Sequence, residues 1–240
     1  TGNETGVLLT DYLFARRAEN GTLPDRPVLV KTIVTTELGL KVAAAYNPET
    51  YDVLTGFKYI GDIIGKLERK GEADRFVFGF EESYGCLAGT YVRDKDAVVA
   101  AMLVSEMAAY YKREGKTLVD RIEALYAQFG TYQHKLLSKE FPGAEGNAKM
   151  KALLTALRAQ LPKELAGSPV TETVDYLTQT QFDLPKSNVL SFKTADGSQL
   201  IIRPSGTEPL IKFYITAAKT PAENEKTFAR ITAWINEKFI

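Results

Sequence analysis

The chain has 240 residues and a mass of 26.5 kDa, with 45% hydrophobic and 25% charged residues. These values suit a soluble globular protein of about two domains and exclude a collagen-like, disulfide-rich or disordered chain. Thirty Lys and Arg balance thirty Asp and Glu, which argues against a general nucleic-acid binder. The single Cys86 and single His134 exclude an intrachain disulfide and a multi-cysteine zinc site.

No stretch of the sequence is apolar for long enough to cross a membrane, and no signal peptide opens it. The low cysteine content suits a reducing compartment. We therefore expect a cytoplasmic protein that does not bind membranes. The sequence begins at Thr1 within a helix-like apolar run, so we also expect it to be a piece of a longer protein.

The first half alternates helix and strand patterns. Apolar residues at helical spacing, a capping residue or both predict helices over 6–17, 37–46, 60–67, 97–113 and 118–129. β-Branched and aromatic runs predict strands over 28–34, 51–54 and 75–80. Strands separated by helices predict an α/β domain with a mixed, mostly parallel sheet and flanking helices.

The second half has a different pattern. We predict strands over 132–141, 189–192 and 199–202, a strand containing Ile211, Phe213 and Ile215, a helix over 150–161 and a last helix after Thr220. Asp196-Gly197 lies between two of these strands, a strong hairpin signal. These features predict a smaller α+β domain with an antiparallel sheet. The pattern changes near Gly130, so we expect domains at 1–130 and 131–240.

A candidate phosphate site lies between two strands, at Arg203-Pro204-Ser205-Gly206-Thr207-Glu208-Pro209. An arginine fork, two hydroxyls and nearby backbone N–H groups can converge on one anion. The plainer interpretation is a strand connection made of turn residues. The carboxylate of Glu208 counts against phosphate unless it points away.

A candidate sugar site follows a strand, at Gly79-Phe80-Glu81-Glu82-Ser83-Tyr84-Gly85. Open α/β sheets bind ligands at the carboxyl ends of their strands, and carboxylates and hydroxyls pair well with sugar hydroxyls. The alternative is an ordinary polar loop. A paired-carboxylate glycosidase is disfavoured, because neighbours in sequence are poorly placed to flank one bond.

Two shorter segments complete the candidates. Arg93-Asp94-Lys95-Asp96 is a poor metal site, because its cations compete with Mg²⁺. Asp96 is better placed to cap the next helix, and Lys95 could reach a phosphate. Thr55-Gly56-Phe57-Lys58 is a glycine-containing turn between a strand and a helix, a suitable place for ligand contacts.

Together, in this order and at these separations, the loops resemble the α-D-phosphohexomutase family, in its glucose-specific form. The resemblance covers essentially the whole chain but only the last two of that family's four domains. It implies substrate contacts by Glu81, Ser83, Thr55, Gly56, Lys58 and Lys95, and phosphate contacts by Arg203, Ser205, Gly206 and Thr207.

The resemblance also implies which parts are absent. No Ser is followed by His-Asn-Pro and no Asp-x-Asp-x-Asp run occurs, so the phosphoserine and the metal ligands of the family are missing from this sequence. We expect no catalytic and no metal-binding residue here, and a fragment that is inactive alone. Mg²⁺ and glucose 1,6-bisphosphate would serve the full-length enzyme, and the N-terminal domains and a phosphosugar would be the partners.

The implied reaction interconverts glucose 1-phosphate and glucose 6-phosphate through glucose 1,6-bisphosphate. Family members that act on mannose or pentose phosphates are alternatives. So are a catalytically silent phosphosugar-binding protein and a structural interaction module whose loops bind nothing.

Overall fold

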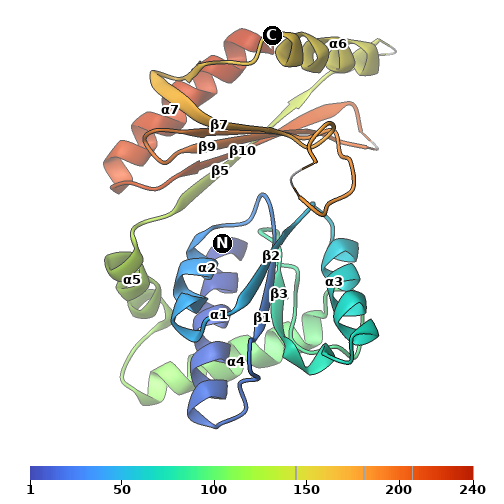
Figure 1. Cartoon of the computed structure of the whole chain (residues 1–240). Helices are drawn as coiled ribbons and strands as arrows, with labels where there is room; N and C mark the ends of the chain where they lie inside the picture. The colour runs from blue at the N-terminus through green and yellow to red at the C-terminus, as the bar shows by residue number, and fades with distance from the viewer. Residues whose placement is uncertain (144, 181, 207, 240) are drawn as a thin grey trace. The chain divides into compact units, whose positions relative to one another are not determined.

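The computed structural model describes residues 1–143, 145–180, 182–206 and 208–239. The chain divides into two compact units, Thr1–Gly130 and Thr131–Ile240, and each is described by itself. The first is an α/β unit with a mixed sheet and the second an α+β unit with an antiparallel sheet (Figure 1), so the predicted fold class is confirmed.

The first unit is built on a four-stranded sheet in the order β2-β1-β3-β4. Its strands are β1 (Val28–Thr32), β2 (Glu49–Val53), β3 (Phe76–Phe80) and β4 (Cys86–Leu87). Its helices are α1 (Gly2–Glu19), α2 (Leu38–Ala43), α3 (Phe57–Arg69), α4 (Ala97–Arg113) and α5 (Leu118–Phe129), with short 3-10 turns at Ala44–Tyr46 and Ala73–Arg75. Strand β1 is parallel to β2 and β3, whereas β4 is antiparallel to β3.

Helices cover both faces of this sheet, with α1, α2 and α5 on one side and α3 on the other in Figure 1. Consecutive residues of β3 show the two faces. The Phe80 ring packs against Gly6 of α1, whereas Gly79 lies against Ile60 of α3. Burial on both faces explains why every residue of β1 and β3 is buried and why neither strand alternates between apolar and polar residues.

The start of α4 is fixed by the cap that the sequence predicted. The Asp96 carboxylate accepts hydrogen bonds from the Val98 and Val99 amides at 2.8 and 3.2 Å. These bonds satisfy N–H groups that the helix itself cannot pair. The carboxylate is therefore engaged in capping.

The second unit contains a six-stranded antiparallel sheet in the order β5-β10-β9-β8-β7-β6. Its strands are β5 (Gln133–Glu140), β6 (Glu164–Leu165), β7 (Ser168–Asp175), β8 (Leu190–Thr194), β9 (Gln199–Pro204) and β10 (Leu210–Ala217). The predicted hairpin around Asp196-Gly197 is confirmed as β8–β9.

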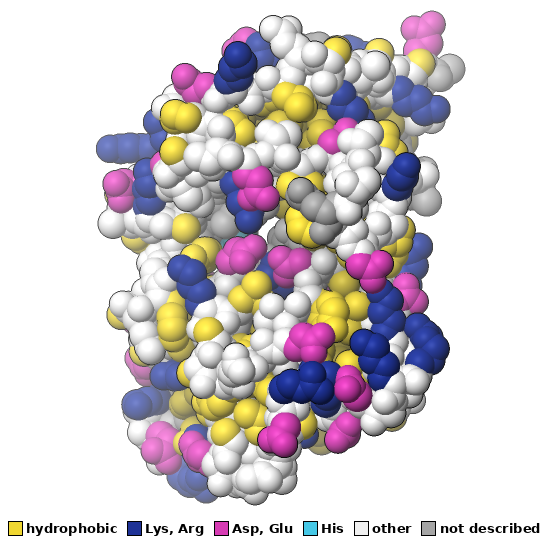
Figure 2. Space-filling view, in the orientation of Figure 1, with side chains coloured by type: hydrophobic (Ala, Val, Ile, Leu, Met, Phe, Trp, Pro, Cys, Tyr) yellow, Lys and Arg dark blue, Asp and Glu magenta, His cyan; other side chains and the backbone are white. Residues whose placement is uncertain are grey.

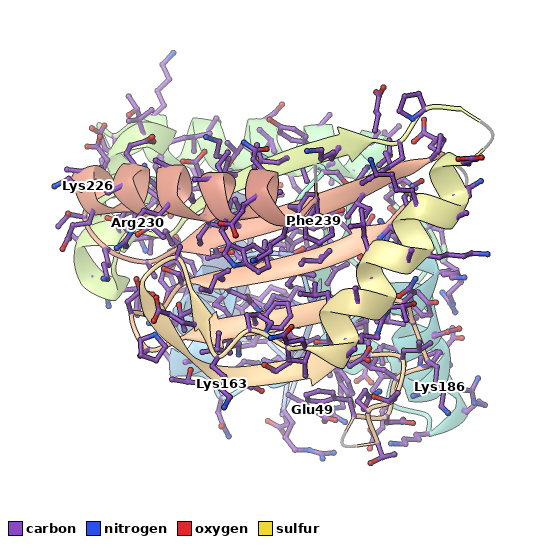
Figure 3. All side chains as sticks on the ribbon, turned by 90° about the horizontal axis from the view of Figure 1, so that it is seen from above. Glu49, Lys163, Lys186, Lys226, Arg230 and Phe239 are labelled. Atoms are coloured by element: carbon purple, nitrogen blue, oxygen red, sulfur yellow. The ribbon has the colours of Figure 1, made fainter. Side chains whose placement is uncertain are left out.

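Helices α6 (Gly146–Ala159) and α7 (Pro221–Lys238) cover one face of that sheet (Figure 3). Their apolar residues meet those of the central strands: Leu154, Ile231 and Phe213 belong to one buried cluster. The Phe239 ring lies edge-on to Phe213, with 4.9 Å between the ring centroids. Within the residues that the structure describes, no helix is long and apolar enough to cross a membrane.

Candidate functional site

The loop after β3 forms a tight turn. The Glu81 amide donates a hydrogen bond to the Gly85 carbonyl at 2.8 Å, which closes the loop on itself. Ser83 is exposed in this loop, and Tyr84 is 68% exposed. Tyr84 has a φ of 70°, a left-handed conformation that is rare and strained for an aromatic residue. The loop is thus held in one specific shape.

Glu81 is buried at the base of this loop, with 8% of its surface exposed. Its Oε1 accepts a hydrogen bond from the Gly56 amide at 3.0 Å. Gly56 is the N-cap of α3, and its φ of 121° requires glycine. The positive end of a helix dipole stabilises a carboxylate. The structure therefore brings together two predicted site residues from separate loops.

Lys95 joins the same group. A Cβ placed on Gly85 would lie 3.0 Å from Lys95 Cδ and 3.1 Å from Glu81 Oε2. The lysine chain and the carboxylate therefore lie beside the same glycine. Lys95 Nζ is 2.9 Å from Asp94 Oδ1 and 5.9 Å from the centroid of the Phe57 ring. An anionic ligand at this edge would meet the Lys95 ammonium and the carboxylates of Glu81 and Asp94.

The remaining predicted residues of the first unit flank Gly56 in the sequence. Thr55 is half-buried just before Gly56. Lys58 is exposed in the first turn of α3, and its ammonium lies 4.9 Å from the Tyr59 ring centroid. Figure 2 shows Lys and Arg side chains interspersed with Asp and Glu over the visible face of the first unit. That mixture suits a small polar ligand better than nucleic acid.

Titratable groups beside Lys95 are held in defined charge states. Hydrogen bonds from Lys95 lower the pKa of the Asp94 carboxyl. Hydrogen bonds from the Tyr91 hydroxyl and the Val99 and Val98 amides lower the pKa of Asp96. Burial raises the pKa of the Cys86 thiol to about 11, so little of this thiol is ionised at pH 7.

The predicted phosphate loop connects β9 to β10. The Ser205 amide donates to the Leu210 carbonyl at 2.8 Å, and the Glu208 amide donates to Ser205 Oγ at 3.2 Å. The second bond fixes the hydroxyl of Ser205 from within the loop. Gly206 is exposed. Thr207 lies outside the described residues.

Arg203 is half-buried at the end of β9, and its cross-strand partner on β10 is Lys212. Paired residues of an antiparallel sheet project on the same face, where directly opposed like charges are destabilising. Within the described residues, neither cation forms an ion pair with a carboxylate. An anion between them would relieve their repulsion.

Sequence reasoning did not assign Lys212 to the site, because its position in an alternating strand indicated only that it lies opposite the buried face. The signal that identifies it is the strand register. Ser138 of β5 is the other neighbour of Lys212. The row Ser138–Lys212–Arg203 thus offers a hydroxyl and two cations across three strands.

Known proteins resemble both units. Residues 1–129 match the family model for phosphoglucomutase/phosphomannomutase alpha/beta/alpha domain III, and residues 140–233 match the model for the C-terminal domain of the same family. Phosphoglucomutase from Staphylococcus aureus (strain MRSA252) is 38% identical over 225 residues, which are 90% of this chain and 39% of that protein.

Two solved structures share the fold. The open form of pp63/parafusin, a phosphoglucomutase from Paramecium, matches 99% of this chain and 40% of its own with a TM-score of 0.66 and 20% identity. Aspergillus fumigatus N-acetylphosphoglucosamine mutase, in complex with GlcNAc-6P and magnesium, matches 99% of this chain and 44% of its own with a TM-score of 0.52 and 13% identity. This chain spans about 40% of the length of the curated relatives it matches. The two family models cover most of its residues, and the chain belongs to the phosphoglucomutase/phosphomannomutase family.

Proposed function

We propose that this chain is the substrate-recognition part of a phosphoglucomutase, which interconverts glucose 1-phosphate and glucose 6-phosphate through glucose 1,6-bisphosphate. The observation that carries the proposal is the gathering of Glu81, Gly56 and Lys95 around Gly85 at the carboxyl end of β3. Support also comes from the curated relatives, which are named phosphoglucomutase.

In this proposal the first unit binds the sugar. The carboxylate of Glu81 and the hydroxyl of Ser83 accept hydrogen bonds from sugar hydroxyls, because both are strong acceptors for O–H donors. The Thr55-Gly56 turn fixes the Glu81 carboxylate through the Gly56 amide. Lys58 and Lys95 supply positive charge for a phosphorylated ligand.

The second unit holds the phosphate that is not being transferred. Arg203 provides two parallel donors, Lys212 provides a point charge, and Ser205, Gly206 and Thr207 provide the loop. Binding energy from this remote phosphate orients the reacting end of the sugar. One pocket of this kind can hold the phosphate in either orientation of the sugar.

The phosphoryl-transfer chemistry is assigned to the remainder of a longer polypeptide. Among the residues that the structure describes, no group of three or more His, Cys, Asp or Glu side chains could hold a metal ion. The curated relatives are about 2.5 times as long as the segment they share with this chain. We therefore place the phosphoserine and the Mg²⁺ ligands in those further domains.

A binding titration tests the recognition role. Glucose 1-phosphate and glucose 6-phosphate should each shift the amide resonances of Gly56 and Gly85 in one unit and of Ser205 and Gly206 in the other. Free glucose should shift only the first pair of resonances, and inorganic phosphate should shift the second pair more strongly than the first. Mannose 1-phosphate tests sugar preference. Unchanged resonances in both loops at high millimolar phosphosugar would contradict the proposal.

An activity assay tests the location of the chemistry. The 240-residue chain should give turnover of glucose 1-phosphate indistinguishable from buffer, with Mg²⁺ and glucose 1,6-bisphosphate present. A longer protein that contains the phosphoserine and metal-binding domains should be active. Protein-dependent turnover by the chain alone would overturn this location, and inactivity of the longer protein would favour a silent phosphosugar-binding protein.

A further inference from the structure

Helix α3 contains two interior glycines, Gly61 and Gly65. Glycine in a helix interior is less favourable than alanine by about 1 kcal/mol, so its presence calls for a packing reason. At Gly61, a Cβ would lie 2.8 Å from the Arg93 carbonyl oxygen and 3.4 Å from Arg93 Cβ. At Gly65 the nearest atom is the flexible end of Arg69, at 3.5 Å. Of the two, Gly61 is the one that packs directly against a backbone.

The backbone that touches Gly61 leads directly to Lys95. On the α3 side, the Arg93 guanidinium forms an ion pair with Glu68 of the same helix. On the sheet side, the Asp96 amide donates to the Cys86 carbonyl of β4 at 3.0 Å. Lys95 therefore lies between two residues that are held in place: Arg93 by α3 and Asp96 by β4.

Lys95 follows Arg93 by two residues in the chain. The distance between the Arg93 backbone and α3 therefore affects the position of the Lys95 side chain. The aliphatic part of that side chain lies beside Gly85, next to the Glu81 carboxylate. A methyl group on residue 61 would be too close to the Arg93 oxygen, and the segment would have to move away from α3. Lys95, two residues further along, would move with it.

We infer that Gly61 is a positioning residue: it lets the Arg93 backbone lie directly on α3 and so sets the side chain of Lys95 beside Gly85 and Glu81 for an anionic sugar ligand. The ligand assignment rests on the proposed function. The placement of Lys95 by Gly61 does not, and the two parts are tested separately.

The first test needs no ligand. In Gly61→Ala, the amide resonances of Arg93 to Asp96 and of Gly85 should shift. Gly65→Ala is the matched control, since it makes the same change one turn later on the same helix without a backbone neighbour. Its resonances in these segments should match the wild type. If Gly61→Ala does not fold, Glu68→Ala removes another contact between the same segment and α3, the ion pair with Arg93, and should shift the same resonances. Unchanged Lys95 and Gly85 resonances in the folded variant would overturn the inference.

The second test asks whether Gly61 acts through Lys95. A hydrogen bond to a charged group contributes about tenfold or more to affinity, so displacing Lys95 through Gly61→Ala should weaken glucose 1-phosphate binding about tenfold. In a Lys95→Ala background, the same change should have less than about a twofold effect, because residues that act as a unit are not additive. Equal effects in both backgrounds would overturn the inference. If the wild type does not bind the phosphosugar, the proposed function fails, and the resonance comparison still decides the role of Gly61.

Discussion

The Gly56 amide donates a hydrogen bond to Glu81 Oε1 across 3.0 Å and so ties the start of α3 to the loop after β3. One atom of the carboxylate is thereby fixed by the protein itself. The side chain enters the site in a defined orientation, with its charge compensated by a helix terminus. This bond couples the stability of the unit to the geometry of the loop after β3.

Replacing Glu81 should therefore affect stability and binding together. Glu81→Ala leaves the Gly56 amide without its charged acceptor and should lower the free energy of unfolding by about 1.5–3 kcal/mol. Glu81→Gln keeps an oxygen acceptor and should be less destabilised, yet both variants should bind glucose 1-phosphate more weakly. Urea unfolding and ligand titration measure the two effects. Glu123→Ala, at an exposed glutamate of α5, is the control. Wild-type stability in Glu81→Ala would contradict this role of the bond.

Arg203 should dominate phosphate binding in the second unit. Arg203→Ala should weaken the binding of inorganic phosphate by about 1.5–3 kcal/mol, the range for hydrogen bonds to charged groups. Arg203→Lys should recover only part, because lysine lacks the planar fork. Phosphate titration followed by the Ser205 and Gly206 resonances gives the affinities. Equal affinity in wild type and Arg203→Ala would place the phosphate elsewhere.

Replacing Lys212 should have opposite effects on the stability of the protein and on its affinity for phosphate. Lys212→Met removes the like charge opposite Arg203, so the ligand-free protein should gain about 0.2–1 kcal/mol of stability. The same change should weaken phosphate binding. Lys193→Met is the matched control, since Lys193 projects on the same face of the sheet and pairs with Glu172 at 3.5 Å. A loss of ligand-free stability in Lys212→Met would show that the two cations do not repel one another.

Asp196 should make stability depend on acid pH. Burial alone would raise the pKa of this carboxyl, but hydrogen bonds from Thr194 and Ser198 and the charge of Lys219 outweigh it and lower the pKa to about 2. A depressed pKa stabilises the fold above the unfolded-state value of 3.8, and the contribution disappears as pH falls through the folded-state value.

The variant Asp196→Asn keeps an acceptor and removes the charge. At pH 7 it should be less stable than the wild type by about 2 kcal/mol, the product of a pKa lowered from 3.8 to about 2 and 1.36 kcal/mol per pKa unit. The difference should shrink as pH falls from 4 towards 2. Urea unfolding at several pH values measures it. A difference that is constant over this range would contradict the assigned pKa.

Cys86 should react slowly in the native protein. Its thiol is 6% exposed and its pKa is raised to about 11. At pH 7 the thiolate is therefore scarce, and alkylation should be at least ~100-fold slower than in the unfolded chain. The alkylation rate of Cys86 in the urea-unfolded protein is the control. Equal native and unfolded rates would show that β4 opens readily.

The sequence was sufficient wherever structure depends on neighbours along the chain. Buried runs predicted β1 and β3, Asp196-Gly197 predicted the β8–β9 hairpin, and Asp96 predicted the start of α4. Each depends on local backbone preference, on a hydrogen bond within one turn, or on the length of an apolar run. The position of Glu81 just after a strand could be predicted from the sequence for the same reason.

Some strands depend on pairing alone and were not predicted. The strand β4 has two residues, too few for any periodicity. The strand β7 contains a proline and is largely exposed, so its pattern is weak. Both segments form strands because a neighbouring strand supplies backbone hydrogen-bond partners. That neighbour is β3 for β4 and β8 for β7.

The contacts that make the site were decided by the tertiary structure. Glu81 and Gly56 are 25 residues apart, and the pairing of Lys212 with Arg203 follows from the register of two strands. Gly61 meets Arg93 only because α3 packs beside the segment that begins α4. Residue types and spacing along the chain do not fix such distances. They are set when sheet register and helix packing bring remote backbones within a few ångströms of one another.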